Sequence, residues 1–170
     1  HPNSIMLFRM GDFYETFEDD AIQTSEILGI ALTKRANGAA AKVPLAGFPY
    51  HALDQYLHKL LKAGHRVAIC EQVEDPKLAK GIVKREVMEV LSPGTAVSDK
   101  YLDQKENNYL CAVTLDKRKC GISILDHSTG EFSACSRDHE DLLSMLKQFH
   151  VSEVIIPEDQ EDDFRILTQG

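Results

Sequence analysis

The chain has 170 residues, enough for one domain with a substantial core or for one domain and part of a second. Its 43% hydrophobic and 27% charged residues are typical of globular proteins, and no apolar run approaches the roughly 18 residues of a membrane span. The sequence shows no secretory leader and opens at His1 without an initiator methionine, so we expect a piece of a larger cytoplasmic protein.

The net charge of −8 is unevenly distributed along the chain. Residues 1–100 contain twelve Lys and Arg against thirteen Asp and Glu, whereas residues 101–170 contain seven against fourteen. Residues 30–85 carry ten basic and four acidic side chains, a net charge of +6. This basic middle region is suited to contact phosphates, and a mixed solvated surface is the alternative interpretation.

The cysteines form no C-x-x-C pair and no closely spaced framework. We therefore expect reduced, mostly buried thiols at Cys70, Cys111, Cys120 and Cys135. A metal site that combines cysteines with His51 or His127 is the alternative.

The first elements are predicted as a strand over Ile5–Arg9, a break at Gly11 and a helix over Phe13–Leu28. Asp12 is a good N-cap, and Glu15 follows three residues later, as in a capping box. An apolar stripe at helical spacing supports this helix, and Gly29 is its expected stop; the stripe consists of Tyr14, Phe17, Ala21 and Leu28.

The rest of the first 95 residues mixes strands and helices. The predicted elements are a strand over Ile30–Thr33, a mobile loop over 35–42, a helix over Leu53–Ala63 that ends at Gly64, a buried strand over Arg66–Glu71, a turn at Glu74–Pro76 and a strand over Val83–Leu91. This order predicts an α/β or α+β domain with a mixed central sheet flanked by helices.

Residues 96–107 are polar and are predicted to link this domain to a second one at 108–170. Short strands separated by turn residues predict an antiparallel meander there, followed by a helix, a fourth strand and an acidic end with helical character. The strands are Leu110–Leu115, Gly121–Leu125, Glu131–Cys135 and Val154–Ile156, and the helix is Asp138–Phe149.

Several blocks of sequence, in order, resemble the N-terminal mismatch-recognition domain of the MutS family of bacterial DNA mismatch repair proteins. The blocks are Phe8-Arg9-Met10-Gly11-Asp12-Phe13-Tyr14-Glu15, Leu32-Thr33-Lys34-Arg35, residues 43–52, residues 67–72 and Ser92-Pro93-Gly94-Thr95. The resemblance implies DNA mismatch repair, and it implies that residues 108–170 begin a ribonuclease-H-like connector domain.

Phe13 is the central residue of the functional hypothesis. At helical pitch it points about 100° away from Tyr14, outside the apolar stripe, and we expect it to be exposed. An exposed aromatic ring stacks on a nucleobase with about 1–3 kcal/mol. Inserted from the minor groove it unstacks base steps, which costs least where pairing is already defective. A core aromatic residue is the alternative.

The resemblance implies that the ring of Phe13 stacks on the mispaired base and that Glu15 hydrogen-bonds to it. Without the resemblance, helix capping explains Glu15 equally well. Groove or backbone contacts are further predicted for Met10, Lys34, Arg35, Lys42 and Leu45, with Lys80, Lys84 and Arg85 as weaker candidates. Solvated loop charges are the alternative for the basic residues.

Two other classes of function are alternatives to DNA binding. A metal-dependent nuclease would need clustered carboxylates, for which Asp116, Asp126 and Glu131 are the candidates, although turns favour Asp for backbone reasons. The acidic second domain would also suit a protein-interaction module. The chain has no G-x-x-x-x-G-K-[ST] loop, so we expect no ATPase in it. We also expect that this chain holds no cofactor and is not an enzyme.

The resemblance also implies properties of a full-length protein. ATP and Mg²⁺ would bind to a C-terminal domain outside this chain. The partners would be mismatched double-stranded DNA, a MutL-like protein and a second copy of the protein, with no membrane contact, and the location would be the bacterial cytoplasm at the nucleoid.

Overall fold

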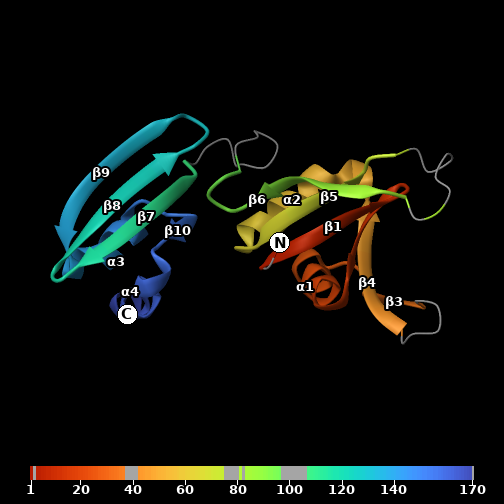
Figure 1. Cartoon of the computed structure of the whole chain (residues 1–170), viewed down its shortest axis with the longest axis horizontal. Coiled ribbons are helices and arrows are strands. Elements are labelled where there is room, and N and C mark those ends of the chain that lie inside the picture. Colours follow the sequence, from red (N-terminus) through yellow and green to blue (C-terminus); the bar gives the residue numbers. More distant parts are fainter. Residues whose placement is uncertain (2, 37–41, 75–80, 82, 97–106, 170) are drawn as a thin grey trace. The chain divides into compact units, whose positions relative to one another are not determined.

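The residues that the structure describes form two sheets, each with its own helices (Figure 1). The computed structural model describes residues 1, 3–36, 42–74, 81, 83–96 and 107–169. Contacts divide the chain into unit 1, His1–Ser92, and unit 2, Pro93–Gly170. The linker predicted at 96–107 lies almost entirely outside the described residues.

Unit 1 contains a mixed sheet with the strand order β3-β4-β2-β1-β5-β6 in the described residues, as the sequence predicted for the fold class. β1 pairs with β5 in parallel, and the other pairs are antiparallel. The elements are β1 Ser4–Met10, β2 Phe13–Phe17, α1 Glu18–Leu28, β3 Thr33–Ala36, β4 Lys42–Pro49, the 3₁₀ helix η1 Tyr50–Ala52, α2 Leu53–Lys62, β5 Arg66–Gln72 and β6 Arg85–Leu91.

The prediction of a helix from Phe13 was wrong for its first five residues, which form β2. The segment is rich in aromatic and β-branched side chains, and it pairs with β1 on one side and β4 on the other. Asp12 is therefore a turn residue and no helix cap. Gly11 has φ 60°, as a two-residue type II′ hairpin loop requires at its first position.

The helix α1 begins only at Glu18, and three acidic residues in its first turn complement the positive end of the helix dipole. Its predicted end is confirmed: Gly29 is left-handed with φ 66°, and its N–H donates to the Ser25 carbonyl at 2.9 Å.

The other differences in unit 1 concern the second hairpin. The strand expected at Ile30–Thr33 lies instead at Thr33–Ala36, and β4 was not predicted. Arg35 and Lys42, placed in a mobile loop from sequence, lie in paired strands. Residues 37–41 of that loop and residues 75 and 76 of the predicted turn lie outside the described part of the chain.

The core of unit 1 packs the sheet against its helices, which also contact each other. Strand alternation buries Leu7 and Tyr14 on one face, together with Phe48. The Phe48 ring lies 4.7 Å from the ring of Tyr56 on α2 and 6.0 Å from that of Tyr14. The predicted helix and buried strand at α2 and β5 are confirmed.

Unit 2 has the predicted meander, helix and fourth strand, in the order β10-β7-β8-β9 with β10 parallel to β7. The acidic end forms a further helix. The elements are β7 Tyr109–Asp116, β8 Lys119–Asp126, β9 Glu131–Asp138, α3 His139–Gln148, β10 Glu153–Ile155, the 3₁₀ helix η2 Glu158–Gln160 and α4 Glu161–Thr168. The core packs Leu142 of α3 on apolar residues of β7 and β8.

None of the helices in the described part of the chain is long and apolar enough to cross a membrane.

Candidate nucleic-acid interface

Phe13 lies at the tip of the β1–β2 hairpin and is 47% exposed, whereas its neighbour Tyr14 is 3% exposed. The expected exposure is confirmed, but its cause differs from the one predicted. Successive residues of a strand point to opposite faces, so Tyr14 enters the core and Phe13 leaves it. A large apolar ring is thus held in solvent on a strand that is hydrogen-bonded on both sides.

Glu15 shares the face of Phe13, two residues along β2. It does not cap a helix, so the capping interpretation was wrong. Its Oε2 accepts a hydrogen bond from Nη1 of Arg35 at 3.1 Å, with the Glu15 and Arg35 side chains 20% and 60% exposed. Arg35 comes from β3, and Glu15 therefore has a cationic partner two strands away.

The room for the Glu15 side chain is created by Gly47, which lies directly opposite on β4. A Cβ atom added to Gly47 would lie 2.9 Å from the Tyr14 carbonyl oxygen and 3.3 Å from Glu15 Cγ. Only glycine leaves this space without a shift of the strands.

The strand register assigns the remaining predicted contact residues to faces. Cross-strand partners point to the same side, and Met10 pairs with Phe13 while Leu45 pairs with Phe17 and Thr33. One face therefore carries Met10, Phe13, Glu15, Arg35 and Leu45. The register places Lys34 and Lys42 on the opposite side.

Arg85 does not point freely into solvent, as a phosphate ligand would. Its Nε donates to the Arg9 carbonyl at 3.0 Å, and its two terminal nitrogens donate to Val83 O and to Met10 Sδ. It fixes the end of β1 beside the hairpin tip. Lys84 forms an ion pair with Glu86 at 2.6 Å, and Lys80 lies outside the described residues.

Residues that the sequence did not suggest also shape the tip of the β1–β2 hairpin. Arg9, on the face opposite to Phe13, stacks on the ring of Tyr50, and Gly47 leaves the space beside Glu15 open. No local pattern indicates these roles, since each depends on a partner strand.

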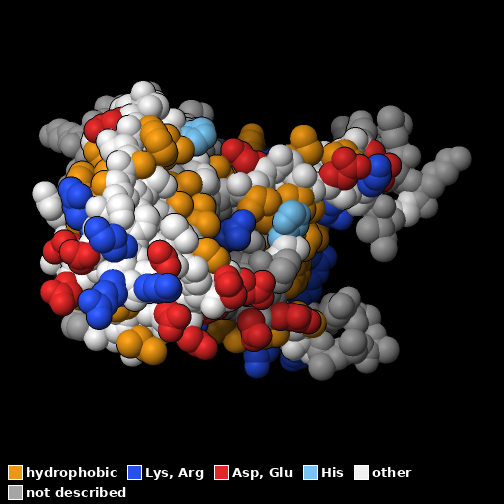
Figure 2. All heavy atoms as spheres, turned by 60° about the vertical axis from the view of Figure 1, so that its left-hand side comes forward, with side chains coloured by type: hydrophobic (Ala, Val, Ile, Leu, Met, Phe, Trp, Pro, Cys, Tyr) orange, Lys and Arg blue, Asp and Glu red, His pale blue; other side chains and the backbone are white. Residues whose placement is uncertain are grey.

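Charges of both signs are interspersed on the face shown in Figure 2. In unit 1, two members of the basic middle region, Arg35 and Lys84, have carboxylate partners. The mixed solvated surface is therefore the better description of these two side chains in the free protein.

Of the three nuclease candidates, the fold brings together only Asp126 and Glu131, which are cross-strand partners on β8 and β9. Asp116 and Asp126 lie at opposite ends of the β7–β8 pair, which seven residues of strand separate by about 23 Å. Asp126 is fully buried and accepts hydrogen bonds from Ser128 N, Ser128 Oγ and Thr129 N, as expected of a turn residue. No group of three potential metal ligands occurs among the described residues.

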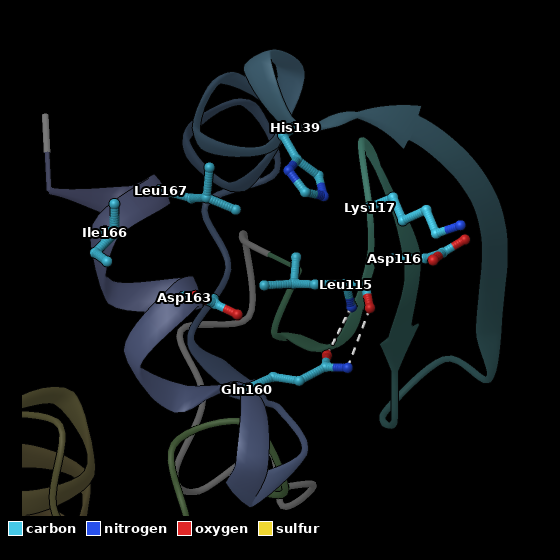
Figure 3. A pocket seen from close by; sticks show the side chains of 8 residues that line it. All are labelled: Leu115, Asp116, Lys117, His139, Gln160, Asp163, Ile166 and Leu167. Atoms are coloured by element: carbon cyan, nitrogen blue, oxygen red, sulfur yellow. Dashed lines mark hydrogen bonds between the residues drawn. The ribbon is translucent and has the colours of Figure 1, made fainter.

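Unit 2 has a cleft of about 300 Å³ (Figure 3). At its edge, the Gln160 side chain bonds to the backbone of Leu115 as a neighbouring strand would. Gln160 Oε1 accepts a hydrogen bond from Leu115 N at 2.7 Å, and Gln160 Nε2 donates to Leu115 O at 3.1 Å. The cleft is lined by Leu115, Asp116, Lys117, His139, Gln160, Asp163, Ile166 and Leu167. Of the nuclease candidates it includes Asp116 alone.

The four cysteines are free thiols, and three are buried, as expected. Burial raises the pKa of Cys111 to about 11 and also raises the pKa of Cys70 and Cys120. These thiols are poor nucleophiles and poor metal ligands near neutral pH.

Comparison with known proteins decides the family. The family model described as MutS domain I matches residues 1–100, and that of MutS domain II matches residues 108–169. The chain belongs to the MutS family. Domain II is the connector domain of MutS, and its match covers most of unit 2, which contains the predicted beginning of that fold.

Close relatives agree with this assignment. The DNA mismatch repair protein MutS of Phocaeicola vulgatus is 56% identical over 91% of this chain, and that of Porphyromonas gingivalis is 53% identical over 98%. The protein of the same name from Bacteroides thetaiotaomicron is 53% identical over the whole chain. The chain spans 18%, 19% and 19% of the lengths of these relatives.

Proposed function

We propose that unit 1 recognises mispaired or unpaired bases in duplex DNA, as part of a protein of DNA mismatch repair. Phe13 enters from the minor groove and stacks on the defective base, while the Glu15 carboxylate accepts a hydrogen bond from that base. The observation that carries the proposal is the exposed Phe13 ring at the tip of a hydrogen-bonded hairpin, with Glu15 on the same face, in a chain of the MutS family.

The difference in affinity between mispaired and paired DNA comes from the cost of unstacking the bases. Stacking on an aromatic ring contributes about 1–3 kcal/mol for any base, because every base has a π face. Unstacking a base step costs a few kcal/mol, and this cost is smaller at a mismatch. The sum is therefore favourable at a defect and unfavourable in paired DNA, without any reading of sequence.

Glu15 can change partners at little cost. Its ion pair with Arg35 is partly exposed, and such pairs contribute about 0–1 kcal/mol. On binding, the carboxylate would exchange the guanidinium for a base N–H that a correct pair would have occupied. The released Arg35, on the same face, would then be available to a phosphate or to the groove, beside Met10 and Leu45.

Lys34 and Lys42 have a different place in this proposal. Both are exposed on the opposite side of the β3–β4 hairpin, so they would contribute to phosphate attraction and not to contact with the base. We assign unit 2 to the connection with other parts of the protein.

For the full-length protein we propose what the family implies. ATP and Mg²⁺ would bind to a C-terminal domain outside these residues. A second copy and a MutL-like protein would be its protein partners, in the bacterial cytoplasm at the nucleoid. We assign no catalytic step to the described residues.

The test compares binding of the full-length protein to a duplex with one mispair and to its paired counterpart. Phe13→Ala should reduce the ratio of the two affinities by about 5- to 150-fold, the equivalent of one stacking contact, and leave paired binding within about twofold. Phe132→Ala is the matched control, because Phe132 is 64% exposed on unit 2. An unchanged ratio in Phe13→Ala would contradict the proposal.

A further inference from the structure

On the face opposite to the Phe13 ring, side chains contact the hairpin tip. Arg9 pairs with Tyr14 across the hairpin and shares its face, which is opposite to that of Phe13. The Arg9 guanidinium carbon lies 3.8 Å from the centre of the Tyr50 ring and 5.6 Å from that of Tyr14. The guanidinium is therefore stacked on one tyrosine and near a second.

The same two residues also hold the backbone of the loop. Arg9 Nε donates to the Gly11 carbonyl at 2.5 Å, and Tyr50 N donates to the Asp12 carbonyl at 2.9 Å. Both residues of the two-residue loop thus have a carbonyl bound by the Arg9–Tyr50 pair. Tyr50 directly follows Pro49, the cross-strand partner of Phe13, so it joins the tip to β4.

We propose that Arg9 and Tyr50 are positioning residues that stiffen the hairpin tip, so that Phe13 keeps its place when it is pressed against a base pair. This inference rests on the proposed function of Phe13. Insertion into a stack exerts a force on the ring and hence on the loop. A loop free to bend would yield before the bases do, and the difference between paired and mispaired DNA would shrink.

Side-chain substitution can remove the stack between Arg9 and Tyr50, and at Arg9 it also removes the hydrogen bond to Gly11, whereas the bond from Tyr50 N to Asp12 is made by the backbone. Tyr50 is 44% exposed, so its ring is not needed to fill the core. Tyr50→Phe keeps the aromatic face for Arg9, whereas Tyr50→Ala removes it. The pair of variants separates the stack from the hydroxyl group.

The experiment is a double-mutant cycle in the full-length protein, with Arg9→Ala, Tyr50→Ala and the two combined. The readout is the ratio of affinities for a duplex with a single G·T mispair and for its paired counterpart. Each single variant should lower the ratio by about three- to tenfold, the range expected of one cation–π contact. The combined variant should lower it no further than Arg9→Ala alone, because Arg9→Ala already removes the stack that Tyr50→Ala removes.

Two controls complete the design. Tyr50→Phe should retain the wild-type ratio of mispaired to paired affinity, and Phe13→Ala should lower that ratio. Paired-duplex affinity should be unchanged in the single variants, because a general loss of structure would lower both affinities together. If Tyr50→Ala does not fold, Arg9→Lys, which retains the charge but not the planar group, takes its place and should lower the ratio.

Additive effects of Arg9→Ala and Tyr50→Ala would overturn the inference, since they would indicate separate contacts with DNA. An unchanged ratio in both single variants, with the ratio lost in Phe13→Ala, would overturn it and leave the proposed function intact. An unchanged ratio in Phe13→Ala would instead refute the proposed function itself.

Discussion

Gly47→Ala should destabilise unit 1 although it adds a single methyl group. The new Cβ would lie 2.9 Å from the Tyr14 carbonyl oxygen, and this atom is backbone and cannot rotate away. Relief requires β4 to move relative to β2. Overpacking of this kind costs about 1–3 kcal/mol, whereas the lower entropy of the unfolded chain returns about 0.4–1 kcal/mol. We expect a net loss of about 0.5–2 kcal/mol.

Gly81→Ala is the matched control for the same chemical change. No atom lies within 4 Å of a Cβ built on Gly81, and its φ is not in the left-handed region. This variant should be neutral or slightly stabilised. The same methyl group is added at both positions, so a difference in stability between the two variants reports the space around each glycine.

The assay is a urea series on this chain, followed by amide NMR resonances of unit 1. Resolved resonances are needed because a protein with two compact units need not unfold in one step. A second readout is the carboxyl ¹³C resonance of Glu15, which should shift because the new methyl also lies 3.3 Å from Glu15 Cγ. Equal stability of Gly47→Ala and Gly81→Ala would refute the reasoning.

The remaining predictions concern the ionisation of Tyr14 and the reactivity of the cysteine thiols. Burial and the hydrogen bond to Glu71 raise the pKa of Tyr14 from 10.0 to about 12, so the unfolded chain loses this proton first and stability should fall as the pH rises through that interval. The urea midpoint of wild type should therefore fall relative to that of Tyr14→Phe above about pH 10, and parallel curves would contradict this. Among the thiols, Cys135 should react first with iodoacetamide, because the others are buried; peptide mass spectrometry showing earlier labelling of Cys111 would contradict it.

The elements predicted correctly are those whose pattern is local. α2 has its buried leucines at helical spacing, β5 is a short apolar run, and the meander of unit 2 has turn residues between alternating strands. Neighbouring residues suffice to specify each of these elements. The fold class followed from their order along the chain.

The segment Phe13–Phe17 shows where local reasoning fails. Asp12 and Glu15 match a capping box, and Tyr14 and Phe17 fit a helical stripe as well as a strand. Pairing with β4, about 30 residues further on, decides between the two. A pattern confined to the segment does not contain that partner, so tertiary context overrode the propensity.

The same limit applies to the candidate site. The sequence drew attention to Phe13 and Glu15 through the family resemblance, but it treated Lys34 and Arg35 alike. Only the register of β3 against β4 puts Arg35 on the face of Glu15 and Lys34 on the other. Consecutive residues of a strand differ in function because they differ in face.

Placing the aromatic ring on a strand and not on a helix has a mechanical consequence. The first turn of a helix frays readily, because its N–H groups lack partners within the helix. Phe13 is instead on β2, between β1 and β4, so its backbone cannot retreat without breaking ladders on two sides. Under the proposed function the cost of insertion then falls on the DNA, and a rigid probe converts a difference in base-pair stability into a difference in binding. Residues that fix the hairpin, such as Arg9 and Gly47, should therefore affect recognition without touching a base.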